Sequence, residues 1–315
     1  MTFEYYNNAA TSRDLRTIKV YNNLSTTPLQ TISLTKSPFS NYRGDRLDQV
    51  TFQNQQGGSY NYQFGYNGDP GQNPGGVDYW GYYNGRGLSY SDYIPNFIVS
   101  RLGYSGGYQI GSLDRSANET SMQVGVLNKI VFPTKGYTEF KYEAHKALNQ
   151  DFGGLRIKEI YNYNSDGTLA EKKWYKYGMN ESGQGRPAIY PKVEDFMISS
   201  RTLEIYQDSY TAPCLGQIID QKTFLAFPKQ SYFTSGSSVV YPQVTEYTGN
   251  GNGDIGKTVY EFEDFPDELP MYIETARSGA VDMPIRTYTW KNGKLKLKDV
   301  FKKENNLYTR IYSLS

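Results

Sequence analysis

One local pattern recurs along most of the chain: two arms of alternating apolar and polar residues, joined by a short turn that contains glycine. The stretch LRIKEIYNYNSDGTLAEKKWYKYG, from Leu155 to Gly178, shows it most clearly and turns at Asp166 and Gly167. Alternation with a period of two gives each face of a strand its own set of side chains, and Asp-Gly tolerates the positive φ angles of a type I′ turn. The pattern therefore predicts antiparallel β-hairpins.

Four further stretches follow the same plan and predict hairpins of their own. They are Leu127 to His145 with a turn at Pro133 and Gly136, Leu47 to Tyr66 with a turn at Gly57 and Gly58, Pro242 to Asp264 with a Gly/Asn-rich turn, and Pro284 to Phe301 with a turn at Asn292 and Gly293. Each unit has a hydrophobic face that it cannot cover alone, so neighbouring hairpins must continue one sheet or pack as two. We expect an all-β protein of successive antiparallel β-hairpins that form a large curled sheet, an open shell or a sandwich, with minimal helix.

Composition agrees with this fold class, because 31 tyrosines accompany 31 glycines and both suit strands joined by tight turns. Helix is expected for no more than a turn or two, within Tyr142 to Phe152 and Pro191 to Tyr206. At 315 residues the chain is long enough for one or two domains. The stretch from Gly85 to Gln123 interrupts the hairpins and predicts a long excursion or a junction. Residues 1–120 would then form an N-terminal hairpin region and 121–315 a C-terminal one, unless both belong to one continuous domain.

The charge, the cysteine content and the lack of long apolar runs exclude several kinds of partner and bond. The formal net charge is +1 with acidic and basic residues interspersed, so we expect no nucleic acid and no anionic membrane surface as a partner. The single cysteine, Cys214, excludes an intrachain disulfide and is interpreted as inert. No apolar run approaches the roughly 18 residues of a membrane helix, and the first ten residues lack the features of a signal peptide. Membrane insertion by this segment is not expected.

Catalytic candidates are few. His145 is the only histidine, so a zinc site rich in histidine is excluded and any Ser/His/Asp triad would depend on this residue. We interpret it as a surface or interface histidine at a strand end. Glu261 and Glu263 alternate along a predicted strand and could act as a glycosidase acid and nucleophile. A solvated strand face explains them more simply.

The loop NGNGD, Asn250 to Asp254, places polar oxygens at alternate positions, with Glu261 where a calcium-binding loop has its last ligand. Its sixth position is Ile255, where such a loop needs glycine, and both flanks predict strands. We therefore interpret it as a hairpin loop and expect neither a metal nor a cofactor.

The stretch DYWGYYNG, Asp78 to Gly85, has two interpretations. Its rings could stack on sugars while polar side chains bind hydroxyl groups, which would make a ligand-binding site of Asp78, Trp80, Tyr82, Tyr83 and Asn84. The alternative is a structural corner, in which the rings are buried and Asn84-Gly85 forms the turn.

Three stretches in a fixed order resemble a known family. DYWGYYNG, the run LDRSANETSMQVGVLNKIVFPTKGYTEFKYEAH and then FGGLRIKEIYNYN resemble the large Rhs-like surface proteins of Bacteroidetes, and the hairpin at Asp166 resembles their YD-repeat unit. The resemblance covers roughly Arg46 to Gly178. Phe132 departs from the family's tyrosine, and Lys135 stands where the family prefers a glycine, which predicts a different turn.

The resemblance implies a β-structured scaffold located in the bacterial cell envelope or outside the cell. It predicts a non-enzymatic structural or interaction module, whose partners would be other segments of a longer polypeptide, a cell-surface glycan or a protein. A carbohydrate- or peptide-binding β-domain with exposed aromatics is the first alternative, and a glycoside hydrolase-like enzyme is the second. Toxicity in Rhs relatives resides in a separate C-terminal domain, and nothing in this sequence resembles one.

Overall fold

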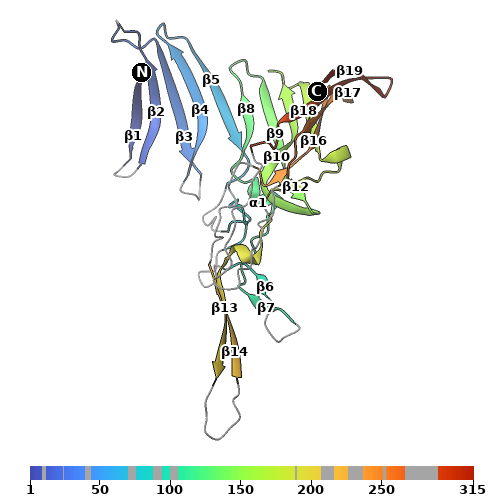
Figure 1. The fold of residues 1–315 in the computed structure, drawn as a ribbon. Coiled ribbons are helices and arrows are strands. Elements are labelled where there is room, and N and C mark those ends of the chain that lie inside the picture. Colours follow the sequence, from blue (N-terminus) through green and yellow to red (C-terminus); the bar gives the residue numbers. More distant parts are fainter. Residues whose placement is uncertain are drawn as a thin grey trace.

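Thirteen of the described strands form one antiparallel sheet whose spatial order follows the order of the chain (Figure 1). The computed structural model describes residues 1–8, 12–23, 25–39, 44–69, 76–87, 94–99, 106–188, 190–206, 216–225, 237–250, 253–266 and 290–315. The strands of the sheet are β1 (Thr2–Asn8), β2 (Ser12–Val20), β3 (Gln30–Pro38), β4 (Asp45–Asn54), β5 (Ser59–Tyr66), β8 (Leu127–Val131), β9 (Tyr137–Ala147), β10 (Gln150–Tyr163), β11 (Leu169–Tyr177), β16 (Gln243–Asn250), β17 (Gly253–Phe262), β18 (Leu295–Glu304) and β19 (Leu307–Leu314). The sheet is open, with β1 at one edge and β19 at the other, which confirms the all-β prediction.

Four of the five predicted hairpins are present: β4–β5, β8–β9, β10–β11 and β16–β17. The first arm of the fifth, residues 284–289, lies outside the described residues, and β18 pairs with β17 and β19. The hairpin β18–β19 was not predicted. It turns at Asn305 and Asn306, which both have positive φ, and asparagine tolerates that conformation.

Three hairpins share one turn, and it is not the type I′ turn predicted for Asp166-Gly167. In each, a three-residue loop ends with a residue at positive φ: Gly57 at 88°, Lys135 at 70° and Gly167 at 82°. The residue before the loop donates its N–H across the turn, as from Asn164 to the Thr168 carbonyl at 2.9 Å. A type I turn followed by one left-handed residue has this form. Lys135 thus enters the left-handed region, where glycine would be less strained.

The first excursion from the sheet lies between β5 and β8, which pair directly with each other. Its described elements are β6 (Phe97–Val99), β7 (Tyr108–Ile110) and the short helix α1 (Glu119–Met122). It begins at residue 67, earlier than the predicted Gly85, and therefore includes DYWGYYNG. The strands on both sides of residue 120 are neighbours in one sheet, and division into two domains stays a prediction.

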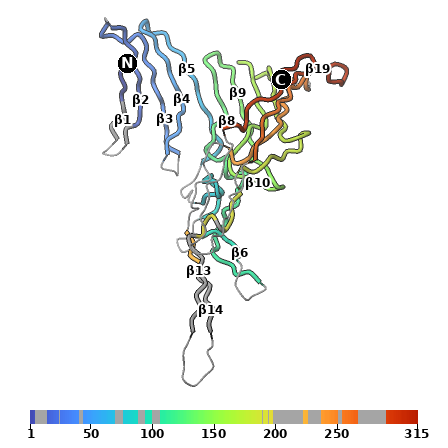
Figure 2. The backbone as a smooth tube through the Cα atoms, in the orientation of Figure 1, coloured from blue at the N-terminus to red at the C-terminus, as the bar shows by residue number. Residues whose placement is uncertain are grey.

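The second excursion lies between β11 and β16. It comprises η1 (Met179–Glu181), β12 (Arg186–Pro187), η2 (Val193–Asp195), β13 (Met197–Tyr206), β14 (Gly216–Phe224) and β15 (Val239–Val240). The hairpins β6–β7 and β13–β14 point away from the sheet on the same side (Figure 1). The backbone trace shows the same course for β6 (Figure 2).

Of the two segments in which a turn of helix was expected, only the second contains one. Tyr142 to Phe152 belongs to strands β9 and β10, with a turn at Leu148 and Asn149, so that prediction was wrong. Pro191 to Tyr206 holds one 3₁₀ turn, η2, and then strand β13. The unpredicted helix α1 begins after Asn118, whose side chain accepts a hydrogen bond from the Ser121 N–H at 2.9 Å.

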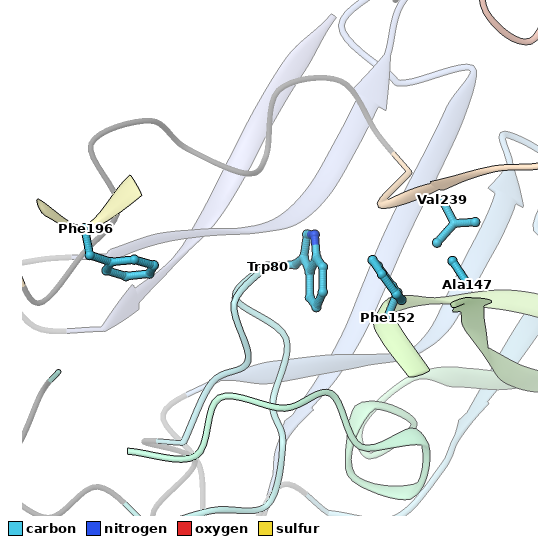
Figure 3. Close-up of a cluster of buried hydrophobic side chains, with 5 residues drawn as sticks. All are labelled: Trp80, Ala147, Phe152, Phe196 and Val239. Atoms are coloured by element: carbon cyan, nitrogen blue, oxygen red, sulfur yellow. The ribbon is translucent and has the colours of Figure 1, made fainter. Parts of the chain in front are cut away.

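Buried apolar side chains gather where the two excursions meet the turn between β9 and β10. Trp80 of the first excursion, Phe196 and Val239 of the second, and Ala147 and Phe152 of the sheet form this cluster (Figure 3). Much of the sheet is only half-buried. The side chains of the two excursions therefore bury the part of the sheet around the turn between β9 and β10.

Aromatic and lysine side chains alternate across neighbouring strands on one face of the sheet. Tyr137 and Tyr163 are paired residues whose rings stack 4.6 Å apart, and Trp174 and Tyr247 stack at 5.3 Å. Lys257 pairs with Tyr247, and its ammonium group lies over that ring. Such cross-strand pairs stabilise a sheet whose faces are not covered by another layer, which accounts for many of the tyrosines.

Candidate functional site

The DYWGYYNG stretch folds into a tight corner organised by the Asp78 side chain. Its Oδ1 accepts hydrogen bonds from the N–H groups of Trp80 and Tyr82, each at 2.9 Å. The Asp78 N–H donates to the Tyr82 carbonyl at 2.8 Å, and Gly81 supplies a φ of 88°. A short carboxylate can cap its own turn in this way, whereas longer acids cannot reach. Asp78 is therefore a structural part of the corner.

Trp80 projects from the corner into the buried apolar cluster. It is 5% exposed, and its ring centre lies 4.9 Å from that of Phe152. Figure 3 shows the indole between Phe152 and Phe196. A sugar could not stack on this indole unless Phe152 and its neighbours moved away. Trp80 is thus placed as the structural interpretation of the motif expects.

Asn84 joins the corner to the stretch that carries the DRSAN residues. Its Nδ2 donates to the carbonyls of Asp114 at 3.1 Å and Ser116 at 3.3 Å, while its Oδ1 accepts from the Arg86 N–H at 3.1 Å. An ion pair at 2.8 Å between Arg86 and Asp114 lies beside these bonds. Because Asn84 is 2% exposed, its amide is satisfied by backbone groups and is not presented to a ligand.

The third motif, FGGLRI, forms the floor under the corner. Gly153 and Gly154 are extra residues in β10, since Phe152 pairs with His145 and Leu155 with Ala144. A Cβ atom on Gly153 would lie 2.6 Å from Trp80 Cβ and 2.8 Å from Asp78 Oδ2. The two excess residues have no side chains, so the corner can approach the strand closely.

Tyr82 and Tyr83 are the half-buried members of the predicted set. The Tyr82 hydroxyl lies over Gly154, 3.3 Å from where its Cβ would be. Tyr83 forms an antiparallel bridge with Val77 that closes the corner. The structure therefore brings all five predicted residues together, but it buries Asp78, Trp80 and Asn84.

Three motifs that are distant in sequence thus meet in one place, which we call the corner cluster: Asp78, Trp80, Asn84, Arg115, Gly153 and Gly154. Burial raises the pKa of the Asp78 carboxyl to about 6, against the lowering effects of the N–H groups of Tyr82, Trp80 and Gly81 and of Arg115. No described residue donates a hydrogen bond to its Oδ2 atom. The protonated carboxyl is therefore favoured more than in water.

His145 lies next to the corner cluster and contacts residues of the second excursion. Its Nδ1 lies 3.3 Å from the Tyr241 hydroxyl and its Nε2 lies 3.4 Å from Ser237 Oγ. The Tyr241 oxygen accepts from the Lys146 N–H at 3.0 Å, so its own proton is available to Nδ1. The neutral tautomer that fits these contacts carries its proton on Nε2. Burial first, and then Arg156, lowers the pKa of His145 to about 4.

This arrangement does not activate Ser237. The nitrogen that faces the serine carries the proton, and Ser237 Oγ donates to the Val239 carbonyl at 2.6 Å. His145 is the interface histidine that the sequence predicted, half-buried near the end of β9. Sequence reasoning missed Ser237 and Tyr241, because a contact across 96 residues leaves no local signal.

Arg156 of the same FGGLRI motif anchors this neighbourhood. Its Nε donates to Glu143 at 2.9 Å and its Nη1 to the Gly183 carbonyl at 3.0 Å. The guanidinium also lies over the rings of Tyr177 and Tyr241 at 4.3 and 4.9 Å. A buried cation needs such complete pairing. The arginine in the motif thus holds the second excursion to the sheet.

The other candidates from the sequence do not converge with the corner cluster. Glu261 lies on β17 and Glu263 just after it, and both are half-buried where we expected a solvated face. Asp254 of the NGNGD loop bonds to Lys303 at 2.6 Å and to the Tyr308 hydroxyl, while Gly251 and Asn252 lie outside the described residues. Cys214 also lies outside them. Within the described part of the chain, no three metal-binding side chains gather and no helix could cross a bilayer.

The fold and the corner cluster define a class: an open antiparallel sheet with two long excursions that are fastened to it by buried aromatic and hydrogen-bonded residues. No protein-family profile, curated protein or solved structure shows detectable similarity to the chain.

Proposed function

We propose that the chain is a non-enzymatic structural and interaction module of a bacterial cell-envelope or secreted protein of the Rhs-like, YD-repeat type. One observation carries this proposal. The three motifs of the resemblance meet in the corner cluster, where Asp78 and Asn84 bond to backbone groups and Trp80 is buried. Side chains that are buried and bonded to the backbone in this way hold the fold together, which supports a scaffold more than a reaction.

The enzyme alternative has less support from the same contacts. A nucleophile needs an adjacent base with a free nitrogen, and His145 has its nitrogens directed at Tyr241 and Ser237 with the proton on the serine side. Glu261 is contacted by Gln243 and lies on a strand rather than beside the histidine. The hydrolase therefore stays a secondary proposal.

Localisation tests the proposal directly. Cells of the source bacterium would be fractionated and probed with an antibody against the chain, with and without protease treatment of intact cells. We expect the chain in the envelope or the medium, and we expect protease to degrade the envelope fraction. A chain found only in the cytosol would contradict the proposal.

A screen for glycan hydrolysis tests the enzyme alternative separately. We expect no release of reducing ends from a panel of neutral and acidic polysaccharides. Release that is lost in Glu261→Gln or Glu263→Gln, with thermal stability unchanged, would replace the scaffold proposal by the hydrolase.

A further inference from the structure

The most exposed tryptophan of the chain is Trp290 and not Trp80 of the DYWGYYNG motif. Trp290 is 65% exposed, whereas Trp80 is 5% exposed and Trp174 is half-buried. Trp290 opens the turn that precedes β18. Single exposed apolar side chains are common on protein surfaces, so the indole is informative only together with the side chains that gather around it.

The turn that carries Trp290 is fastened to the segment after β17. The Asn292 Oδ1 accepts from the Phe265 N–H at 2.6 Å, and its Nδ2 donates to the Phe265 carbonyl at 3.1 Å. Two backbone bonds add to this: Gly293 N–H to the Glu263 carbonyl at 3.0 Å, and Glu263 N–H to the Lys294 carbonyl at 2.9 Å. The indole is therefore presented on a held turn, so little conformational entropy is lost when it binds.

Ammonium groups surround the exposed indole. The Nζ atoms of Lys291 and Lys294 lie 5.0 and 5.3 Å from the centre of a Trp290 ring, and Lys291 lies 5.0 Å from the Phe265 ring centre. Phe265 is 36% exposed and Leu295 47% exposed. We call this surface the Trp290 patch: Phe265, Trp290, Lys291, Lys294 and Leu295.

The arm that follows is positively charged, although the whole chain is nearly neutral. Residues 290–310 contain six lysines and one arginine against two acids, a net +5 in a chain of net +1. Lys302, Lys303 and Arg310 form ion pairs. Lys294 and Lys296 form no ion pair with the described residues, although Glu263 lies beside the turn, where its N–H donates to the Lys294 carbonyl. An excess of positive charge therefore remains around the exposed indole, where the overall composition predicted no electrostatic partner.

We propose that the Trp290 patch binds an acidic polysaccharide built of uronic acid units. The C–H face of a pyranose would stack on the part of the indole that the lysines leave exposed, and its carboxylate would lie within reach of the two ammonium groups over that ring. A single exposed indole favours a sugar over a nucleic acid, because proteins that bind single strands stack successive bases on several rings along a basic groove. This site is separate from the corner cluster and goes beyond the scaffold proposal.

Binding to polygalacturonate, measured by isothermal titration calorimetry, tests the site. We expect binding that weakens as salt is raised, because exposed charges are screened. Trp290→Ala and the double variant Lys294→Ala/Lys296→Ala should each lower the affinity at least tenfold without changing the melting temperature. The matched controls are Tyr108→Ala, which removes another ring that is 62% exposed, and Lys176→Ala, which removes an exposed lysine elsewhere. Both controls should bind like the wild type.

Four results would overturn the proposal, of which the first three concern the chain, its variants and DNA. The wild-type chain does not bind polygalacturonate, or the two patch variants bind as well as the controls do, or single-stranded DNA of equal charge binds the patch as tightly as polygalacturonate. Neutral dextran serves as the comparison for stacking without charge, and we expect it to bind at least tenfold more weakly. If dextran bound as tightly as polygalacturonate, the carboxylate groups would not contribute to binding, and the proposal of an acidic ligand would be overturned.

Discussion

Asp78 and His145 lie against two consecutive glycines of strand β10: a Cβ atom on Gly153 would lie 2.8 Å from Asp78 Oδ2, and one on Gly154 would lie 3.2 Å from His145 Cδ2. Burial changes the pKa of both groups, but in opposite senses, to about 6 for the aspartate and about 4 for the histidine. At pH 5 the folded chain therefore has a neutral acid beside a neutral base, whereas the unfolded chain has both in charged form.

The two groups should affect stability with opposite signs between pH 4 and 6. Asp78 has a raised pKa, so its contribution is present at low pH and is lost as the pH rises through about 6. His145 has a lowered pKa, so its contribution is present above about 6.5 and is lost as the pH falls through about 4. Each corresponds to roughly 3 kcal/mol at most, and in the wild type they largely cancel.

Single substitutions should separate the two contributions. In Asp78→Asn the free energy of unfolding should rise from pH 4 to 6.5, because only the histidine remains. In His145→Gln it should fall over the same range, because only the aspartate remains. Urea denaturation at several pH values measures both. Slopes of the same sign in the two variants would show that burial does not control these groups as described.

Trp80→Ala should lower the free energy of unfolding by about 3–5 kcal/mol, because a buried ring is lost and a cavity remains. Trp80→Phe keeps an aromatic side chain and should cost less. In a Trp174→Phe/Trp290→Phe background, Trp80 fluorescence should be blue-shifted and poorly quenched by acrylamide. A strongly quenched Trp80, together with a stable alanine variant, would return the motif to the ligand-binding interpretation.

Gly153→Ala should destabilise the chain by about 1–3 kcal/mol through overpacking. Its methyl group would lie 2.6 Å from Trp80 Cβ, so the corner would have to move away from β10. Gly87→Ala is the matched control, since no atom lies within 4 Å of that added Cβ. Thermal melting of the two variants checks the difference, and equal melting temperatures would contradict the close approach.

Lys135→Gly should stabilise the β8–β9 hairpin by roughly 1 kcal/mol, because Lys135 has a φ of 70°, which glycine adopts without strain. The same substitution at Lys176, within strand β11, should destabilise the chain, because glycine weakens a strand interior. Urea denaturation of the two variants compares them. A destabilising Lys135→Gly would indicate that its side chain makes contacts worth more than the strain.

Local patterns predicted the hairpins, because alternation and turn glycines act between neighbouring residues. Local patterns could not predict the type of turn at Asp166-Gly167. Asp-Gly is compatible with a two-residue and with a three-residue loop, and the two loops differ only by one residue in the register of the flanking strands. The strands β9 and β10, which meet within Tyr142 to Phe152 at a turn where Leu148 has a φ of 52°, were missed because their pairing outweighs local preference. For DYWGYYNG the sequence supported burial and exposure alike, and only the packing of Phe152 on Trp80 within the buried cluster distinguishes them.

The serial order of the strands determines how this sheet would respond to mechanical force. The first and last described strands, β1 and β19, lie at opposite edges, so a force applied to residues 1 and 315 pulls across the strands. Such a force loads the hydrogen bonds of one strand pair at a time, in the manner of a zipper. Strands should detach at low force from both edges inward. The part of the sheet that is bonded to the corner cluster should detach last, so the centre of the module would resist force more than its edges.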